Sequence, residues 1–159
     1  MKKANLVARA SLIASCYIVL TLIANAMGLS SGVIQIRFSE ALTILPVFTP
    51  AAIPGLFIGC ILSNIITGCA LFDIIFGSVA TLIGAIGTYA LRNKLKWLSS
   101  LPPIISNALI IPFVLSRVYH FSGSYLYFLL TVGAGEIISC GVLGTALQYS
   151  LIKRNIKNL

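Results

Sequence analysis

The chain has 159 residues, of which 58% are hydrophobic and only 9% are charged. Because a soluble domain carries about 25% charged residues, this composition excludes an ordinary water-soluble fold and predicts an all-α integral membrane protein. The net charge of +8 does not indicate DNA or RNA binding, since basic residues that alternate with apolar spans share no common face.

Six transmembrane helices are predicted from the apolar runs and the breakers between them, in a single membrane domain of residues 1–159. A spanning helix takes roughly 20 residues, so six spans leave only short loops and no soluble catalytic domain. The first run is longer than the apolar core of a signal peptide and lacks a good cleavage site, so we expect a retained helix. The helices are expected at residues 4–27, 39–48, 52–68, 72–91, 102–118 and 125–152.

The basic residues fall into three clusters, at the two ends of the chain and in the loop at 92–100. Such clustering is the positive-inside pattern of a plasma-membrane protein, so both termini and this loop are predicted in the cytoplasm. The outer face then receives Arg37, Asp73 and the segment Arg117–His120. The clustered residues are Lys2, Lys3, Arg9, Arg92, Lys94, Lys96, Lys153, Arg154 and Lys157.

Small residues recur at spacings of four, which lets helix backbones approach closely in a membrane. For the glycine pair Gly55 and Gly59, and for Gly84, packing inside the protein is favoured. The alanine pairs of the first helix, Ala10/Ala14 and Ala4/Ala8, could equally pack internally or face a partner subunit. The isolated cysteines are expected to be buried apolar side chains, neither metal ligands nor disulfides; they are Cys16, Cys60, Cys69 and Cys140.

The only three acidic residues, Glu40, Asp73 and Glu136, each lie in or beside an apolar span. A charged side chain at the bilayer centre costs roughly 2.5–3.5 kcal/mol, so we expect these carboxylates to face a cavity or a partner. Glu136 is flanked by Gly133 and Gly135, which would open space beside it.

Each acidic residue also has a structural alternative. Glu136 could be protonated and form an interhelical hydrogen bond, and Asp73 could cap its helix. Glu40 could form an ion pair with Arg37, three residues away.

An acid-lined pocket favours a cationic ligand or one rich in N–H donors, because a carboxylate accepts two parallel N–H bonds. Asn64 and Asn107 are polar residues within spans and are plausible cavity residues. Aromatic residues near the outer face could stack on a flat ring, although an interfacial belt explains most of them better. These are Phe38, Phe72, Tyr119, Phe121, Tyr125 and Tyr127.

Catalysis has little support, because His120 has no evident Ser or Cys partner in sequence and the chain has no HExxH or GxSxG motif. We therefore predict no enzyme, no cofactor and no metal. The chain also lacks a Walker A motif and a clear internal repeat, which favours a binding subunit that takes its energy from a partner. The alternative is a self-sufficient, proton-coupled carrier of an organic cation with Glu136 as its titrating group.

Three motifs resemble the QueT family of substrate-binding S components of energy-coupling-factor (ECF) transporters, which are implicated in uptake of queuosine precursors. They are R-x-S-E-A-L-T from Arg37, FTPAAIPGLFIG from Phe48 and D-x-x-F-G-S from Asp73. The likeness extends from the first predicted helix to the end of the fourth, and the segment Gly133-Ala134-Gly135-Glu136 adds to it.

The resemblance implies a six-helix S-component bundle with a ligand pocket near the outer face. It also implies docking onto a membrane coupling subunit that is driven by two ATPase subunits. An alanine motif in the first helix contacts the coupling subunit in S components, and Ala10 with Ala14 is the best-placed match. An S component for another vitamin-like nutrient is an alternative that keeps the same fold.

The ligand that the resemblance implies is a 7-deazaguanine such as the aminomethyl form (preQ1), which is cationic at neutral pH. In this interpretation Glu136 or Glu40 holds the guanine-like edge, Asp73 meets the ammonium, and Arg37 orders the lid or meets the ring carbonyl. The substrate-binding candidates are Arg37, Glu40, Asn64, Asp73, Asn107 and Glu136.

Overall fold

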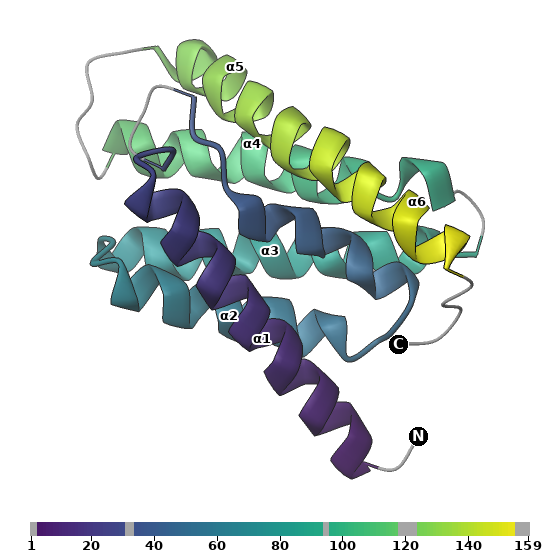
Figure 1. The fold of residues 1–159 in the computed structure, drawn as a ribbon. Helices are drawn as coiled ribbons and strands as arrows, with labels where there is room; N and C mark the ends of the chain where they lie inside the picture. Colours follow the sequence, from purple (N-terminus) through teal and green to yellow (C-terminus); the bar gives the residue numbers. More distant parts are fainter. Residues whose placement is uncertain (1–2, 31–33, 94–95, 118–123, 155–159) are drawn as a thin grey trace.

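The computed structural model describes residues 3–30, 34–93, 96–117 and 124–154, and these ranges contain helices and no strand (Figure 1). The first helix, α1, is followed by a ten-residue 3-10 helix, η1, and the last is one long helix with a π-helical middle, η3. In chain order the elements are α1 (Lys3–Ala26), η1 (Phe38–Val47), α2 (Ala52–Ile66), α3 (Leu71–Leu91), η2 (Lys96–Leu98), α4 (Leu101–Arg117), α5 (Tyr125–Glu136), η3 (Ile137–Gly144) and α6 (Thr145–Lys153).

Three helices are long and apolar enough to cross a membrane, namely Lys3–Ala26, Leu71–Leu91 and the continuous helix Tyr125–Lys153. Three shorter apolar helices, η1, α2 and α4, lie between them along the chain. Large apolar side chains face outward from these helices other than η1, none of whose residues is exposed; Ile58 is 46% exposed, Ile83 49% and Leu130 63%. Such a surface suits lipid rather than water, so the fold is that of an all-helical membrane protein.

The helices pack around η1, which contacts α1, α2, α3, η3 and α6. Helix α1 packs on α2, α2 on α3, α3 on α4, and α4 on α5, so neighbours in sequence are neighbours in space. The first residues of α1 and the last of α6 lie at one end of the bundle, on the right of Figure 1. The turns that follow α1 and α2 lie at the opposite end.

Close helix packing rests on small residues, as predicted for the glycines. A Cβ atom on Gly55 would lie 2.7 Å from the Ala10 carbonyl oxygen, and one on Gly59 would lie 3.1 Å from the Ala14 Cα. The Ala10/Ala14 pair of α1 therefore packs directly on the Gly55/Gly59 pair of α2. A Cβ on Gly84 of α3 would lie 2.7 Å from a backbone atom of α4.

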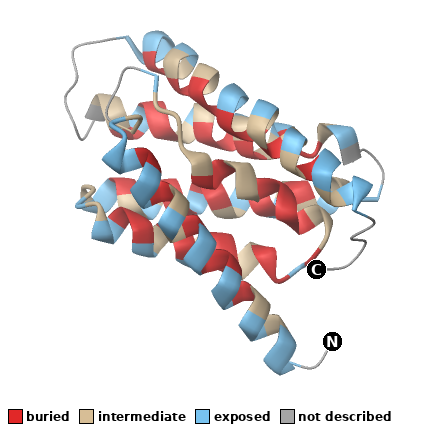
Figure 2. Ribbon diagram, in the orientation of Figure 1, coloured by how far each residue is buried: buried red, intermediate tan, exposed pale blue. Residues whose placement is uncertain are grey.

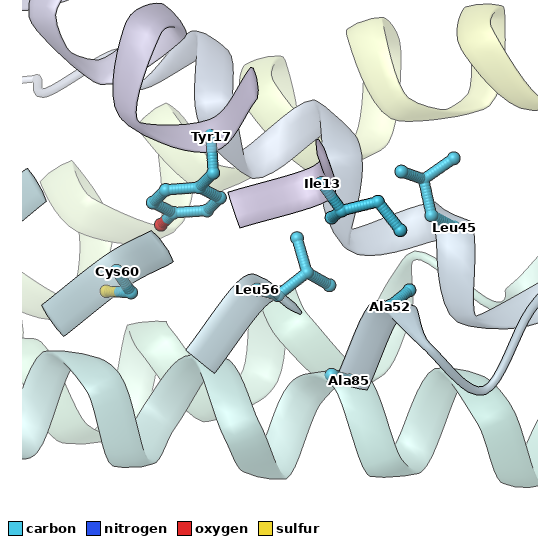
Figure 3. Packing of buried hydrophobic residues seen from close by; sticks show 7 residues of the cluster. All are labelled: Ile13, Tyr17, Leu45, Ala52, Leu56, Cys60 and Ala85. Carbon is cyan, nitrogen blue, oxygen red and sulfur yellow. The ribbon is translucent and has the colours of Figure 1, made fainter. Parts of the chain in front are cut away.

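The buried faces of the helices point inward (Figure 2) and form an apolar core between α1, η1, α2 and α3. The Tyr17 side chain, which is 1% exposed, extends from α1 into this core (Figure 3). The core residues are Ile13, Tyr17, Leu45, Ala52, Leu56, Cys60 and Ala85.

Two predicted helices have the expected positions but an unexpected geometry. The second is a 3-10 helix, in which Pro46 lacks an N–H and the Thr43 hydroxyl donates to the Glu40 carbonyl at 2.6 Å. The last helix widens to a π-helix at Ile137–Gly144, where the Thr145 hydroxyl donates to the Gly141 carbonyl. Neither change follows from an apolar pattern, because that pattern does not report which carbonyl each N–H meets.

All four cysteines are free thiols. Cys60 and Cys140 are buried as expected, but the expectation is wrong for Cys16, which is exposed on α1. Cys69 lies in the turn between α2 and α3 and is partly buried.

Candidate substrate-binding site

A cavity of about 250 Å³ lies at the end of the bundle opposite the first residues of α1 and the last of α6 (Figure 1). We call it the end cavity. The C-terminal ends of α1, α2 and α4, the first turn of α3 and the segment before η1 all contribute to it. Its lining residues are Thr21, Asn25, Ser30, Gln35, Arg37, Asn64, Thr67, Cys69, Asp73, Ile111 and Leu115.

Asp73 is the acidic residue of the end cavity. Asp73 is not the N-cap residue that was predicted as the alternative to a ligand role, because the N-cap of α3 is Ala70. Asp73 instead lies in the first turn, where the helix dipole favours a negative charge, and it is only 6% exposed. Its carboxylate is therefore held in the wall of the cavity by the start of α3.

Asn64 lines the same cavity from α2, as predicted from its place in an apolar span. Its amide donates to the Cys60 sulfur at 3.6 Å. A Cβ on Gly77 would lie 3.4 Å from the Asn64 nitrogen, so this glycine of α3 leaves the amide its space.

Arg37 is the basic residue of the end cavity, and it stands in extended backbone just before η1. Its backbone N–H donates to the Ser139 hydroxyl of η3 at 3.1 Å, and its guanidinium donates to the Gln35 side chain at 3.4 Å. Burial lowers the pKa of Arg37, but the attraction of the Asp73 carboxylate outweighs it, so the pKa lies above its ordinary value. Arg37 therefore carries a fixed positive charge that faces Asp73.

The other two carboxyl groups lie together, deeper in the bundle. Glu40, Glu136 and Cys140 each place one oxygen or sulfur atom within 4.8 Å of the others. The Tyr17 hydroxyl donates to Glu40 Oε1, and the Cys140 thiol donates to Glu136 Oε2 at 3.2 Å. Asn107 lies beside both carboxyl groups. We call the five residues the inner cluster: Tyr17, Glu40, Asn107, Glu136 and Cys140.

Glu40 therefore uses Tyr17 of α1 as its partner and not Arg37, since no Arg37–Glu40 ion pair occurs among the described contacts. The oxygen and sulfur atoms of Glu40, Glu136 and Cys140 are close enough for one cation to contact all three. The Cys140 thiol, however, has one hydrogen for two acceptors, Glu136 Oε2 at 3.2 Å and the Glu40 carbonyl oxygen at 3.4 Å.

Two buried polar atoms of the inner cluster, Glu40 Oε2 and Asn107 Nδ2, have no hydrogen-bond partner in the described structure. Glu40 is 1% exposed and Asn107 3%. A buried polar atom without a partner is costly. Since Asn107 lies beside both carboxyl groups, this acceptor and this donor lie in the same region. Ser30 Oγ, in the lining of the end cavity, is a third such atom.

The space beside Glu136 differs from the prediction. A Cβ on Gly135 would lie 2.1 Å from the Gln35 carbonyl oxygen, so the backbone of the segment before η1 fills that space. Gly133 has only the Ala108 Cβ nearby, at 3.9 Å. Gly135 thus lets the Gln35–Arg37 segment cross α5 between the end cavity and the inner cluster.

The described aromatic side chains do not line the end cavity. Phe72 stacks on Phe76 with ring centroids 6.3 Å apart, and the Tyr125 hydroxyl donates to the Leu109 carbonyl at 2.8 Å. Phe38 and Tyr127 are likewise absent from its lining. Tyr119, His120 and Phe121 fall outside the described residues.

The structure therefore divides the six predicted binding residues into two groups. Arg37, Asn64 and Asp73 line the end cavity, whereas Glu40, Asn107 and Glu136 belong to the inner cluster. Sequence reasoning missed Tyr17 and Cys140. The spacing of four between Glu136 and Cys140 places both on one helix face and was the available signal for Cys140.

An all-helical bundle with a lipid-suited surface, a polar cavity at one end and buried carboxyl groups has the features of a membrane transport protein. A family model described as QueT transporter matches residues 7–153, and the chain belongs to this family. The family is one of transporters and not of enzymes. No curated protein and no solved structure matches the chain.

Proposed function

We propose that this chain is the substrate-binding S component of an ECF importer and binds a queuosine precursor of the 7-deazaguanine class. It spans the plasma membrane six times with both termini in the cytoplasm. The observation that carries the proposal is the end cavity, in a chain of the QueT transporter family. Its volume of about 250 Å³ lies just below the range of roughly 300–1,000 Å³ for drug-sized ligands, which suits a small bicyclic heterocycle.

The charges support a cationic ligand. The described residues of the end cavity and the inner cluster include three carboxyl groups and one guanidinium, that of Arg37. Asp73 faces the cavity and is the natural partner for the ammonium of aminomethyl-7-deazaguanine, since a charge-assisted bond is stronger than a neutral one.

The free polar atoms of the inner cluster support a guanine-like edge. This edge has a ring carbonyl, which accepts a hydrogen bond, beside N–H groups, which donate. Asn107 Nδ2 is a donor and Glu40 Oε2 an acceptor without a partner among the described residues, and Asn107 lies beside both Glu40 and Glu136. In the proposed complex the ligand enters from the end cavity, the carbonyl accepts from Asn107, and the carboxyl groups accept from the ring N–H groups.

The binding test is calorimetric titration of the protein in detergent with aminomethyl-7-deazaguanine, repeated with guanine and with Glu136→Gln. We expect submicromolar binding of the deazaguanine and a loss of about tenfold or more in the variant, because a hydrogen bond to a charged group contributes about 1.5–3 kcal/mol. If the deazaguanine does not bind, the substrate is wrong, and other small flat nitrogenous nutrients should be titrated.

Docking of the coupling subunit is proposed at a groove of about 360 Å³ between α1 and α2. Ala10 and Ala14 line it and, because they also pack on α2, keep its floor shallow. The rest of the lining is mostly apolar with two serines, which suits a helix of another membrane subunit. It comprises Leu6, Val7, Ser11, Ser15, Ile18, Pro54, Ile58 and Leu62.

A bulky residue in this groove should separate binding from transport. We expect Ser11→Trp to keep ligand affinity and to lose most uptake in liposomes that contain the coupling subunit and ATPases. Leu12→Trp is the matched control, since Leu12 is 66% exposed on the same helix but outside the groove. Uptake by the chain alone under a proton gradient would instead favour the carrier with Glu136 as its titrating group.

A further inference from the structure

The inner cluster holds two carboxyl groups in a space where both cannot readily be charged. Glu40 comes from η1 and Glu136 from the end of α5, and they are 1% and 8% exposed. Their nearest ligand atoms lie within 4.8 Å. Two carboxylates at such a separation, away from water, repel each other strongly, and such pairs usually hold one proton between them.

The groups that face this pair from each neighbouring element do not balance two negative charges. Helices α1 and η3 supply the neutral donors Tyr17 and Cys140, α4 supplies the Asn107 amide, and α2 supplies the Cys60 thiol nearby. Among the described residues Arg37 is the one cation that acts on the pair. Arg37 also faces Asp73 of α3 and donates to the Gln35 side chain.

One carboxyl oxygen of the Glu40–Glu136 pair has no described hydrogen-bond partner and can therefore take part in a shared proton. Glu40 Oε1 accepts from Tyr17, while Glu40 Oε2 is buried and has no described partner. An oxygen in this position is satisfied when a proton on one carboxyl group is shared with the other or with a ligand. This oxygen without a partner is a second observation, separate from the closeness of the two carboxyl groups, and it too can take part in a shared proton.

The pair also lies next to the end cavity. Arg37 lines the cavity three residues before Glu40, and the Gln35 backbone crosses α5 at Gly135, next to Glu136. A positive charge placed in the cavity or on the pair itself lowers the cost of ionising both carboxyl groups.

We propose that Glu40 and Glu136 share one proton in the empty protein and release it to solvent when a cationic ligand binds. This inference rests on the proposed function, because it takes the ligand of that same site as the cation. Binding and proton release are then reciprocally linked. Since the ligand prefers the deprotonated pair, its affinity rises with pH across the range in which the pair loses its proton.

The test is calorimetric titration of the full chain with aminomethyl-7-deazaguanine in two buffers of different ionisation enthalpy at one pH. The difference in heat gives the protons released, and we expect close to one per ligand bound at a pH where the pair is protonated. Guanine, which has no ammonium group, should release far fewer. Glu40→Gln and Glu136→Gln should each abolish the proton release. Asp73→Asn should weaken binding, but the proton release per ligand bound should persist.

An infrared measurement tests the shared proton without any ligand. The empty wild-type protein should show a C=O stretching band of a protonated carboxyl group, and the band should disappear in both Glu→Gln variants and persist in Asp73→Asn. Binding without proton release, or an unchanged band in both Glu→Gln variants, would overturn the inference and leave the proposed function standing. Failure of the deazaguanine to bind would overturn the proposed substrate, and the band would still decide whether the pair holds a proton.

Discussion

The end cavity and the inner cluster are built from similar polar residues but differ in how those residues are paired. In the end cavity, Arg37 and Asp73 face a hollow of about 250 Å³. In the inner cluster, Tyr17 and Cys140 already donate to the two glutamates. The difference indicates that the first region selects by charge and space, whereas the second depends on hydrogen bonds that a ligand or a proton must complete.

Gly135→Ala is expected to have the largest effect, because it disturbs the segment that joins the two regions. The new Cβ would lie 2.1 Å from the Gln35 carbonyl oxygen, so the Gln35–Arg37 backbone must move. Overpacking of this kind costs about 1–3 kcal/mol or more. We expect a lower midpoint of thermal unfolding in detergent and a loss of ligand affinity of about a hundredfold, measured by calorimetry.

Gly133→Ala is the matched control for that change. It lies two residues away in α5, and its Cβ would meet only the Ala108 side chain at 3.9 Å. Alanine is favoured over glycine inside a helix by about 0.5–1 kcal/mol, so this variant should unfold at the same temperature or slightly higher. Equal behaviour of the two variants would show that the Gln35 segment does not depend on Gly135.

Tyr17→Phe should disturb the inner cluster alone. The variant removes the hydroxyl that donates to Glu40 Oε1 and leaves that oxygen buried without a partner. The expected loss of unfolding free energy is about 1–3 kcal/mol, seen as a lower midpoint in denaturant or heat. Tyr149→Phe, on a side chain that is 69% exposed, should change nothing; a similar loss there would mean that the Tyr17 effect is not specific to Glu40.

Asp73→Asn should disturb the end cavity alone. It keeps the size of the side chain and removes the charge that faces the ligand ammonium, so we expect an affinity loss of about tenfold for aminomethyl-7-deazaguanine. Affinity for guanine, which has no ammonium, should change far less. Calorimetry with both ligands measures the difference, and equal losses would assign Asp73 a structural role in place of a charge-pairing one.

The positions of the helices could be predicted from the sequence because apolar runs and breakers report where a chain must be buried and where it must turn. Helix α1 was expected at 4–27 and occurs at Lys3–Ala26. The 3-10 form of η1 and the π form of η3 could not be predicted, since they depend on single hydrogen bonds such as that of Thr43.

The candidate site could be predicted only in part, for a related physical reason. A carboxylate in an apolar span is conspicuous in sequence, so Glu40, Asp73 and Glu136 were found. Tyr17 was not, because a tyrosine in an apolar helix is unremarkable until its hydroxyl is seen to meet a glutamate. The division of the acids between two regions depends on the crossing of η1 and η3, a long-range contact that no local pattern encodes.

The smallest expected effect, and the most direct view of the end cavity, comes from Cys69, whose side chain lines it. Bound aminomethyl-7-deazaguanine should slow alkylation of Cys69 by a few fold, measured by peptide mass spectrometry, while Cys16, on the exposed face of α1, reacts at an unchanged rate. Burial raises the pKa of the Cys69 thiol, and only the thiolate reacts. Its rate should therefore keep rising with pH beyond about 8.5, the ordinary value for a thiol, where an unperturbed cysteine levels off. Equal protection of Cys16 would mean that the ligand acts on the whole protein and not at the cavity.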